Sequence, residues 1–194
     1  MKKLLSSITL LMIFVTAFSQ SNDPVKSPSI GINFFFNDFK TPSIISSTSL
    51  SSTLLNKKFG KIKDMVPGLG FSFLKGISSN LDFAGTIGGS FLDYTADNGK
   101  VLGTGSFLLE IDASLHAKML PDNYWVVPYL TAGVGLSKYK GYYGAIMPVG
   151  VGLQINIFND TFIMIDSQYR LKVTESTNYH FLYSIGVVGN LKSL

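Results

Sequence analysis

The sequence predicts an all-β fold, an eight-stranded antiparallel up-and-down transmembrane β-barrel that follows a cleaved signal peptide. Eight segments alternate apolar residues with polar or small ones at every second position, as strands with two unlike faces require. Mean hydropathy is +0.29, yet after the first twenty residues no segment has 18 uninterrupted apolar residues, which excludes a helical membrane protein. The connections alternate between short turns and longer loops, as they do in such barrels.

The first twenty residues, MKKLLSSITLLMIFVTAFSQ, have the composition of an export signal. Lys2 and Lys3 give a charged start, residues 4–18 are largely apolar, and Ala17-Phe18-Ser19 offers small residues at a cleavage site. The alternative is an uncleaved membrane anchor, but the apolar run is short for a spanning helix. We therefore expect residues 1–20 to be a signal peptide and residues 21–194 to form one barrel domain.

Composition excludes several function classes. The chain has no cysteine, which rules out disulfides, thiolate catalysis and cysteine-bound zinc. Its formal net charge of +4 falls to +2 without Lys2 and Lys3. That charge is too small to predict binding of nucleic acid.

The alternating segments, in chain order, are residues 30–37, 68–74, 81–91, 107–120, 126–137, 147–157, 162–173 and 179–191. Most have the length that a tilted strand needs to cross a bilayer. The fourth, FLLEIDASLHAKML, is the clearest, because Glu110, Asp112 and three further polar residues share one face opposite an apolar one. The fifth is the weakest, because Val127 and Pro128 break the contrast.

The remaining segments repeat the pattern with different residues on the second face. In segments one to three the face opposite the apolar one carries glycine, asparagine, serine and Asp82. In segments six and eight it carries mainly glycine, glutamine and asparagine. Segment seven carries Asp166, Gln168, Arg170 and Lys172 on that face. A face so rich in glycine and short side chains suits a narrow interior better than a solvated exterior. This favours the membrane barrel over the alternatives, a soluble β-sandwich or a lipocalin-like barrel.

The connections set the expected orientation. Short stretches GISSN, LPDNYW and FNDT are assigned to the periplasmic side, and the longer ones, including TADNGKVLGTG and the 26 residues from Lys40 to Met65, to the outside. Within loop 40–65, the serine- and threonine-rich stretch from Ser43 to Thr53 is expected to be disordered. For the following LLNKKFGKIKDM, the alternatives are a short amphipathic helix over the rim or on anionic headgroups, and a loosely packed segment.

Aromatic residues cluster near the segment ends, where they predict interfacial girdles. The candidates are Phe34, Phe36, Phe91, Tyr124, Trp125, Phe158, Phe162, Tyr179 and Phe181.

The stretches NDFKTPS, PGLGFSFLKGIS, LDFAGTIGGSFLDY and VPYLTAGVGLSKY, with a leader ending in FSQ, resemble small outer-membrane β-barrel proteins of Gram-negative bacteria. The resemblance is to the uncharacterised barrels common in Bacteroidetes, and it covers nearly all of the chain after the leader. It implies an OmpA-like or OmpX-like barrel in the bacterial outer membrane, without a peptidoglycan-binding domain, and it implies little about activity. The chain departs from many barrels in ending Asn-Leu-Lys-Ser-Leu rather than in an aromatic residue, which bears on its handling by the barrel assembly machinery.

The interior of an eight-stranded barrel is just wide enough for side chains, so inward charges must pair. Glu110 and Asp112 are expected near the height of Arg170, which should be their main counter-charge. His116 and Lys118 should lie lower, close to Asp82. We therefore predict a structural polar network in the lumen, formed by Asp82, Glu110, Asp112, His116, Lys118, Asp166, Gln168, Arg170, Lys172 and His180.

A catalytic interpretation rests on Ser114, His116 and Glu110, which share one face as in lipid-modifying outer-membrane enzymes. These residues should point inward in mid-barrel, where lipid cannot reach them, so no catalytic site is predicted. His116 and His180 are too far apart in sequence to suggest a metal site, and no cofactor is expected.

We expect a monomeric, non-enzymatic outer-membrane barrel with a structural or surface-interaction role through its outer loops. Its expected partners are outer-membrane lipid, the barrel assembly machinery during biogenesis, and a surface ligand of the loops; nucleic acid is not among them. A narrow, porin-like channel or transport accessory is the second alternative. A lipid-modifying enzyme is the third.

Overall fold

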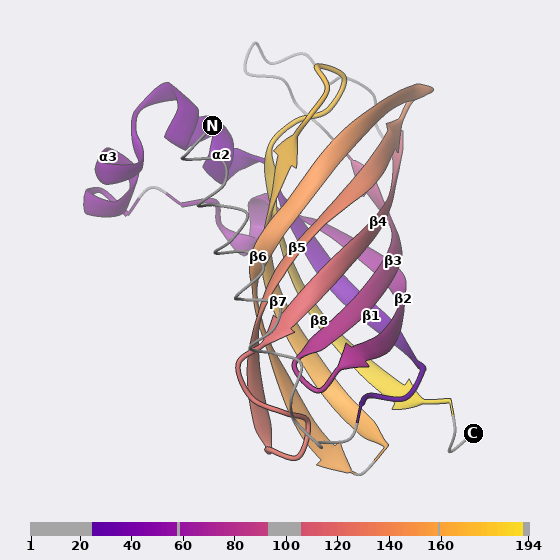
Figure 1. The fold of residues 1–194 in the computed structure, drawn as a ribbon. Coiled ribbons are helices and arrows are strands. Elements are labelled where there is room, and N and C mark those ends of the chain that lie inside the picture. The colour runs from indigo at the N-terminus through magenta and orange to yellow at the C-terminus, as the bar shows by residue number, and fades with distance from the viewer. Residues whose placement is uncertain (1–24, 58, 93–105, 159, 192–194) are drawn as a thin grey trace, which may run out of the picture.

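Eight strands close into one antiparallel barrel in the computed structural model (Figure 1). The structure describes residues 25–57, 59–92, 106–158 and 160–191, so the predicted signal peptide and the stretch TADNGKVLGTG lie outside the described residues. The strands are β1 (Ser29–Asp38), β2 (Val66–Ser78), β3 (Leu81–Leu92), β4 (Ser106–Lys118), β5 (Val126–Tyr139), β6 (Tyr142–Phe158), β7 (Thr161–Lys172) and β8 (His180–Asn190).

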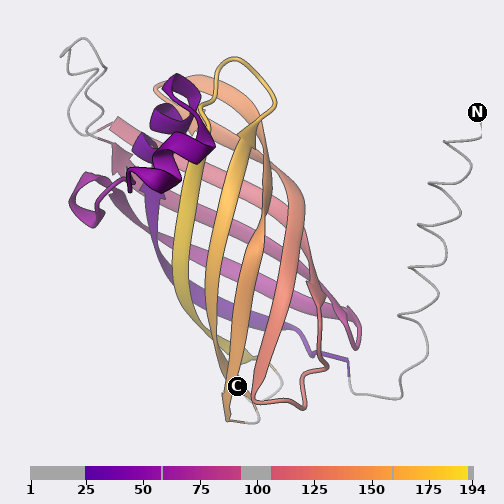
Figure 2. The same cartoon turned by 90° about the vertical axis from the view of Figure 1, so that its left-hand side faces the viewer.

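Each strand pairs with its neighbour in sequence, and β1 pairs with β8 to close the barrel, with Phe34 opposite Ile185. The even number of strands brings both described ends of the chain to one end, where the Leu191 N–H donates to the Pro28 carbonyl (2.9 Å). We call this the turn end, because the β2–β3, β4–β5 and β6–β7 connections lie there, and the opposite one the loop end (Figure 2). The predicted fold, a closed eight-stranded antiparallel barrel, is confirmed.

Burial alternates along the strands as the sequence pattern predicts. On β4, Glu110 and Asp112 are buried whereas Phe107 and Ile111 are exposed. Even the weakest segment obeys the rule, because Val127 is completely buried inside the barrel. Apolar side chains therefore cover the outside of the wall, and the charged ones of β4 point inward.

The long β1–β2 connection contains α2 (Lys40–Ser47), α3 (Leu50–Leu55) and a 3-10 turn, η1 (Ile62–Asp64). The expected disorder of Ser43 to Thr53 is therefore wrong. The hydroxyl groups that suggested a loop are used as helix-end partners: the Ser49 side chain accepts the Ser52 N–H (3.1 Å) at the start of α3. No helix in the described ranges is long and apolar enough to cross a membrane.

Of the two alternatives for LLNKKFGKIKDM, the short amphipathic helix is wrong. Helix α3 ends at Leu55, and Lys57 follows in the left-handed backbone region with a φ of 50°. That conformation stops a right-handed helix. Residues 59–61 then lead to η1 without regular secondary structure.

Strands β5 and β6 meet at a tight turn of two residues. Tyr139 pairs with Tyr142, so only Lys140 and Gly141 connect the strands. Both have positive φ, 48° and 85°, as the two central residues of a type I′ hairpin turn require. Tyr139 and residues 142–144 are therefore strand, and the connection between β5 and β6 has no longer loop.

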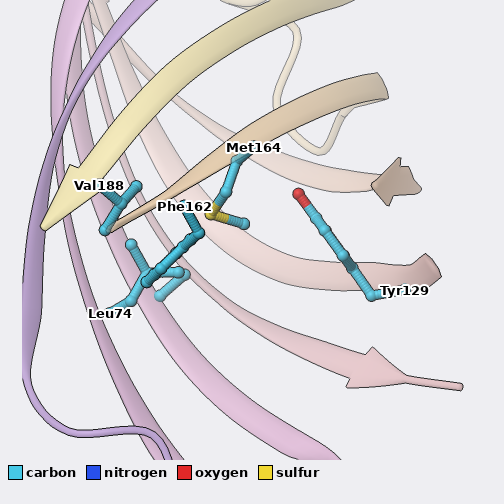
Figure 3. Close-up of a cluster of buried hydrophobic side chains, with 6 residues drawn as sticks. Leu74, Tyr129, Phe162, Met164 and Val188 are labelled. Atoms are coloured by element: carbon cyan, nitrogen blue, oxygen red, sulfur yellow. The ribbon is translucent and has the colours of Figure 1, made fainter. Parts of the chain in front are cut away.

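The lumen also contains an apolar layer toward the turn end. Leu74, Ala84, Tyr129, Phe162, Met164 and Val188 form this buried cluster (Figure 3). The assignment of Phe162 to an interfacial girdle is wrong, because the residue is 7% exposed and lies on the same inward face of β7 as Met164. Phe162 lies in the lumen because its position on β7 faces inward, although its aromatic side chain would also suit the membrane interface.

Candidate functional site

Arg170 of β7 lies at the centre of a charge cluster in the loop-end half of the lumen. Its Nη1 donates to Glu110 Oε2 (2.7 Å) and its Nη2 to Asp112 Oδ2 (2.9 Å). All three side chains are buried. Because β4 and β7 are not neighbours in the barrel, these two bonds cross the lumen. The sequence predicts Arg170 at the height of Glu110 and Asp112 in the lumen, and these are the residues that it contacts.

His180 extends this loop-end cluster toward the barrel mouth. Its Nε2 lies 3.3 Å from Glu110 Oε2, its Nδ1 lies 3.1 Å from the Asn178 carbonyl, and its ring packs on Phe39 with centroids 4.6 Å apart. Gln168 is buried nearby and faces the same cavity as Arg170, but its Oε1 has no hydrogen-bond partner among the described residues.

Asp166 is held by a residue that the sequence did not single out. The Tyr129 hydroxyl donates to Asp166 Oδ1 (2.5 Å), and the Ser184 hydroxyl to Oδ2 (3.3 Å). The Tyr129 ring stacks on His116, with centroids 4.6 Å apart. Tyr129 occupies one of the alternate positions of β5 that face the lumen, and this alternation would have identified it as a member of the network.

A second charge cluster closes the turn end. Lys118 Nζ lies 2.9 Å from Asp82 Oδ1 and 2.7 Å from Asp122 Oδ2. Lys26 Nζ, from the segment before β1, donates to Asp82 Oδ2 (2.6 Å) and to Gln154 Oε1 (2.5 Å). Burial lowers the pKa of Lys26, an effect that Asp82 and Asp122 oppose.

Sequence reasoning missed Lys26, Asp122 and Gln154. Lys26 and Asp122 lie outside the strands, where no alternation marks the inward positions. The N–H of Gly76 donates to the Lys26 carbonyl (3.0 Å), which holds the first described residues against β2. Gln154 is an inward residue of β6, and its register would have identified it.

Lys172 does not join the predicted network. Its Nζ lies 3.1 Å from Glu175 Oε2, and the carboxylate belongs to the exposed β7–β8 loop. The residue is the last of β7 and lies beyond the last pair of β7 with β8, Arg170 with His180, so its side chain is at the barrel mouth rather than in the lumen.

Ser114 and His116 lie side by side inside the barrel, with Ser114 Oγ 3.5 Å from His116 Nε2. Both are buried. Glu110, the candidate third member, bonds to Arg170 and His180 instead. The described residues contain no group of three or more His, Asp or Glu side chains placed to hold a metal ion.

Little space remains between these side chains. A cavity of about 40 Å³ lies in mid-lumen and is lined by residues that include Asn33, Asp112, Gln168, Arg170 and Ser184. One water molecule occupies roughly 30 Å³ in the liquid. This cavity therefore has room for ordered water, and a second cavity of about 140 Å³ lies at the loop end beside Glu110 and His180.

No protein-family model matches this sequence, and no curated protein sequence matches it. Solved structures do. Neisserial surface protein A is similar over 87% of this chain and 100% of its own, with a TM-score of 0.61 and 14% identity. The N-terminal β-barrel domain of Pseudomonas aeruginosa OprF is similar over 86% of this chain and 98% of its own, with a TM-score of 0.53 and 11% identity.

The attachment invasion locus protein Ail of Yersinia pestis, in complex with the heparin analogue sucrose octasulfate, is similar over 84% of this chain and 97% of its own, with a TM-score of 0.51 and 11% identity. All three neighbours are eight-stranded outer-membrane barrels. At these identities the similarity concerns the fold, and the narrower resemblance to barrels of Bacteroidetes stays a prediction. The chain has the fold of the transmembrane eight-stranded β-barrels of bacterial outer membranes.

Proposed function

We propose that this chain is an integral outer-membrane barrel with a structural or surface-interaction role at its loop end, without enzymatic activity and with a lumen closed by its own side chains. The observation that carries the proposal is the inverted distribution of side chains. Ile32, Phe71 and Val134 on the outer wall are 62%, 64% and 68% exposed, whereas Asp82, Lys118 and Arg170 are buried inside. In water such a wall would aggregate, but in lipid it is the favourable arrangement.

The closed lumen favours a structural role over a channel. The Arg170 bonds run across the interior, an apolar layer lies toward the turn end, and the cluster of Lys26 and Lys118 lies at that end. Ions passing through would have to separate buried charge pairs and cross the apolar layer.

A surface-interaction role would use the cationic loop end. Lys57, Lys61, Lys63, Lys138 and Lys140 are all exposed there. The similar barrel Ail was solved with a polyanion, sucrose octasulfate. A polyanionic surface ligand is therefore the chemical class to test first on this chain.

The membrane proposal is tested by fractionation and by electrophoresis with and without boiling. We expect the protein in outer membranes, with unheated and boiled samples migrating differently. Purified protein in planar bilayers should show little or no steady conductance. A periplasmic, heat-independent protein would overturn the membrane assignment, and steady conductance would replace the closed barrel with a narrow channel.

Absence of enzymatic activity is tested on lipid A, the substrate that the Ser114–His116 pair would suggest. Mass spectra of lipid A should be the same in wild-type, deletion, Ser114→Ala and His116→Ala strains. A change in acyl-chain number that follows Ser114 would contradict the proposal.

A further inference from the structure

The segment from Lys40 to Met65, which we call the arm, projects sideways from the loop end of the barrel. In Figures 1 and 2, α2 and α3 stand out from the side of the wall at the height of the strand ends, rather than rising above the mouth. An arm in this position is at the level where the apolar wall ends, which in a membrane is the level of the lipid headgroups.

Buried Asp38, at the end of β1, holds the start of the arm, and Thr41 links the returning chain to the same place. Its Oδ1 accepts the backbone N–H groups of Lys40 and Thr41 (2.9 Å each), and its Oδ2 accepts the Thr41 hydroxyl (2.5 Å). The N–H of Gly60 donates to Thr41 Oγ1 (2.8 Å), so the returning chain is tied to the same point. A Cβ at Gly60 would lie 2.7 Å from Asp38 Oδ1, which explains the glycine. The arm therefore has a defined base on the barrel.

The far part of the arm combines exposed apolar and cationic side chains. Leu55 is 84% exposed, and four further large apolar residues are exposed with it: Leu50, Leu54, Phe59 and Ile62. Lys57, Lys61 and Lys63 lie exposed among them. Between residues 40 and 65 the sequence has five lysines and one aspartate, a formal charge of +4 that equals the net charge of the whole chain.

We propose that the arm lies on the membrane surface, with its exposed leucines, Phe59 and Ile62 among the outer ends of the acyl chains. Lys57, Lys61 and Lys63 then lie on phosphate-bearing lipid headgroups. The inference rests on the proposed membrane location and adds a lipid contact outside the barrel wall. A segment that is both apolar and cationic binds an anionic lipid surface through both properties. The height of the arm makes its apolar side chains a continuation of the exposed apolar wall, which favours lipid over a soluble partner.

The absence of cysteine allows a clean test with single labels. Leu55→Cys, Val134→Cys and Glu175→Cys each carry one environment-sensitive fluorophore, on the arm, on the wall and on a 95%-exposed loop residue. The folded full-length barrel is placed in phosphatidylcholine vesicles containing phosphatidylglycerol and acyl-brominated lipid. We expect strong quenching at positions 134 and 55 and none at 175.

A charge reversal separates headgroup binding from apolar contact alone. Lys57→Glu, Lys61→Glu and Lys63→Glu, combined in the Leu55→Cys protein, should shift the docking equilibrium of the arm by about fivefold for each lysine lost. The same reversal at Lys138, Lys140 and Lys172, which lie off the arm, should leave the label at position 55 quenched.

The outcomes are distinguishable. Quenching at 134 without quenching at 55 overturns the arm proposal and leaves the membrane barrel standing, whereas no quenching at 134 overturns the membrane location itself. Quenching at 55 that the arm reversal leaves unchanged, with or without phosphatidylglycerol, overturns the role of the phosphate-bearing headgroups.

Discussion

The loop-end and turn-end charge clusters of the lumen are built with different redundancy. At the loop end one cation, Arg170, holds the two carboxylates of Glu110 and Asp112 across the barrel. At the turn end two lysines, Lys26 and Lys118, share Asp82, and each has a further partner, Gln154 for Lys26 and Asp122 for Lys118. Loss of the Arg170 side chain leaves the loop-end carboxylates without that guanidinium. Loss of either lysine at the turn end leaves the other lysine in contact with Asp82. The consequences for stability should therefore differ between the two ends.

Arg170→Met should have the largest effect. It leaves two buried carboxylates without their guanidinium, a change that costs about 3 to 5 kcal/mol of unfolding free energy. The variant that also carries Glu110→Gln and Asp112→Asn should recover part of the loss, with a coupling energy above about 0.5 kcal/mol. Urea titrations of the refolded barrel measure both. A neutral Arg170→Met would show that the cross-lumen bonds do not stabilise the fold.

Lys26→Met should cost less, about 1.5 to 3 kcal/mol, because Asp82 keeps its contact with Lys118. The control is Lys26→Arg, which retains the charge and should be closer to wild type in the same titration. If Lys26→Met destabilised the barrel more than Arg170→Met, the proposed difference in redundancy would be reversed.

A smaller effect is expected at Gly152, which lies against the Tyr129 ring between the two clusters. A Cβ there would lie 2.2 Å from Tyr129 Cζ, and Tyr129 is buried, so Gly152→Ala must displace the ring. We expect a loss of about 1 to 3 kcal/mol. Gly189→Ala is the matched control, because its Cβ would have no atom within 4 Å. Equal stabilities of the two variants would argue against tight packing around Tyr129.

The smallest effect is expected for Lys172→Ala, which removes the exposed ion pair with Glu175. Surface pairs of this kind contribute little, so the unfolding free energy should change by less than about 0.5 kcal/mol. The measurement also tests the placement of Lys172 outside the lumen network, since a loss as large as that of Lys26→Met would indicate a buried role.

The strands and most inward side chains could be predicted because alternation is a local signal. The parity of a position within its strand decides whether it faces the lumen, and this holds for Glu110 and Arg170 as well as for the unexpected Phe162. Outside the strands side chains do not alternate between two faces, so the sequence could not show that Lys26 and Asp122 belong to the lumen network. The fold of the arm could not be predicted either, because the bond that ties its returning chain to its start, from the Gly60 N–H to the Thr41 hydroxyl, joins residues 19 apart in the sequence.

The pairing of β1 with β8 also has a kinetic consequence. Ser29 lies opposite Asn190, so this seam joins the two ends of the described chain, and every other strand pairing is between sequence neighbours. Contacts between residues so far apart in sequence carry the largest chain-entropy barrier and form slowly. The hairpins can assemble as an open sheet before the seam joins. Until then β1 and β8 expose unpaired backbone groups, which are costly in the lipid of the proposed membrane location. Closure of the seam is therefore the step expected to limit the rate of folding.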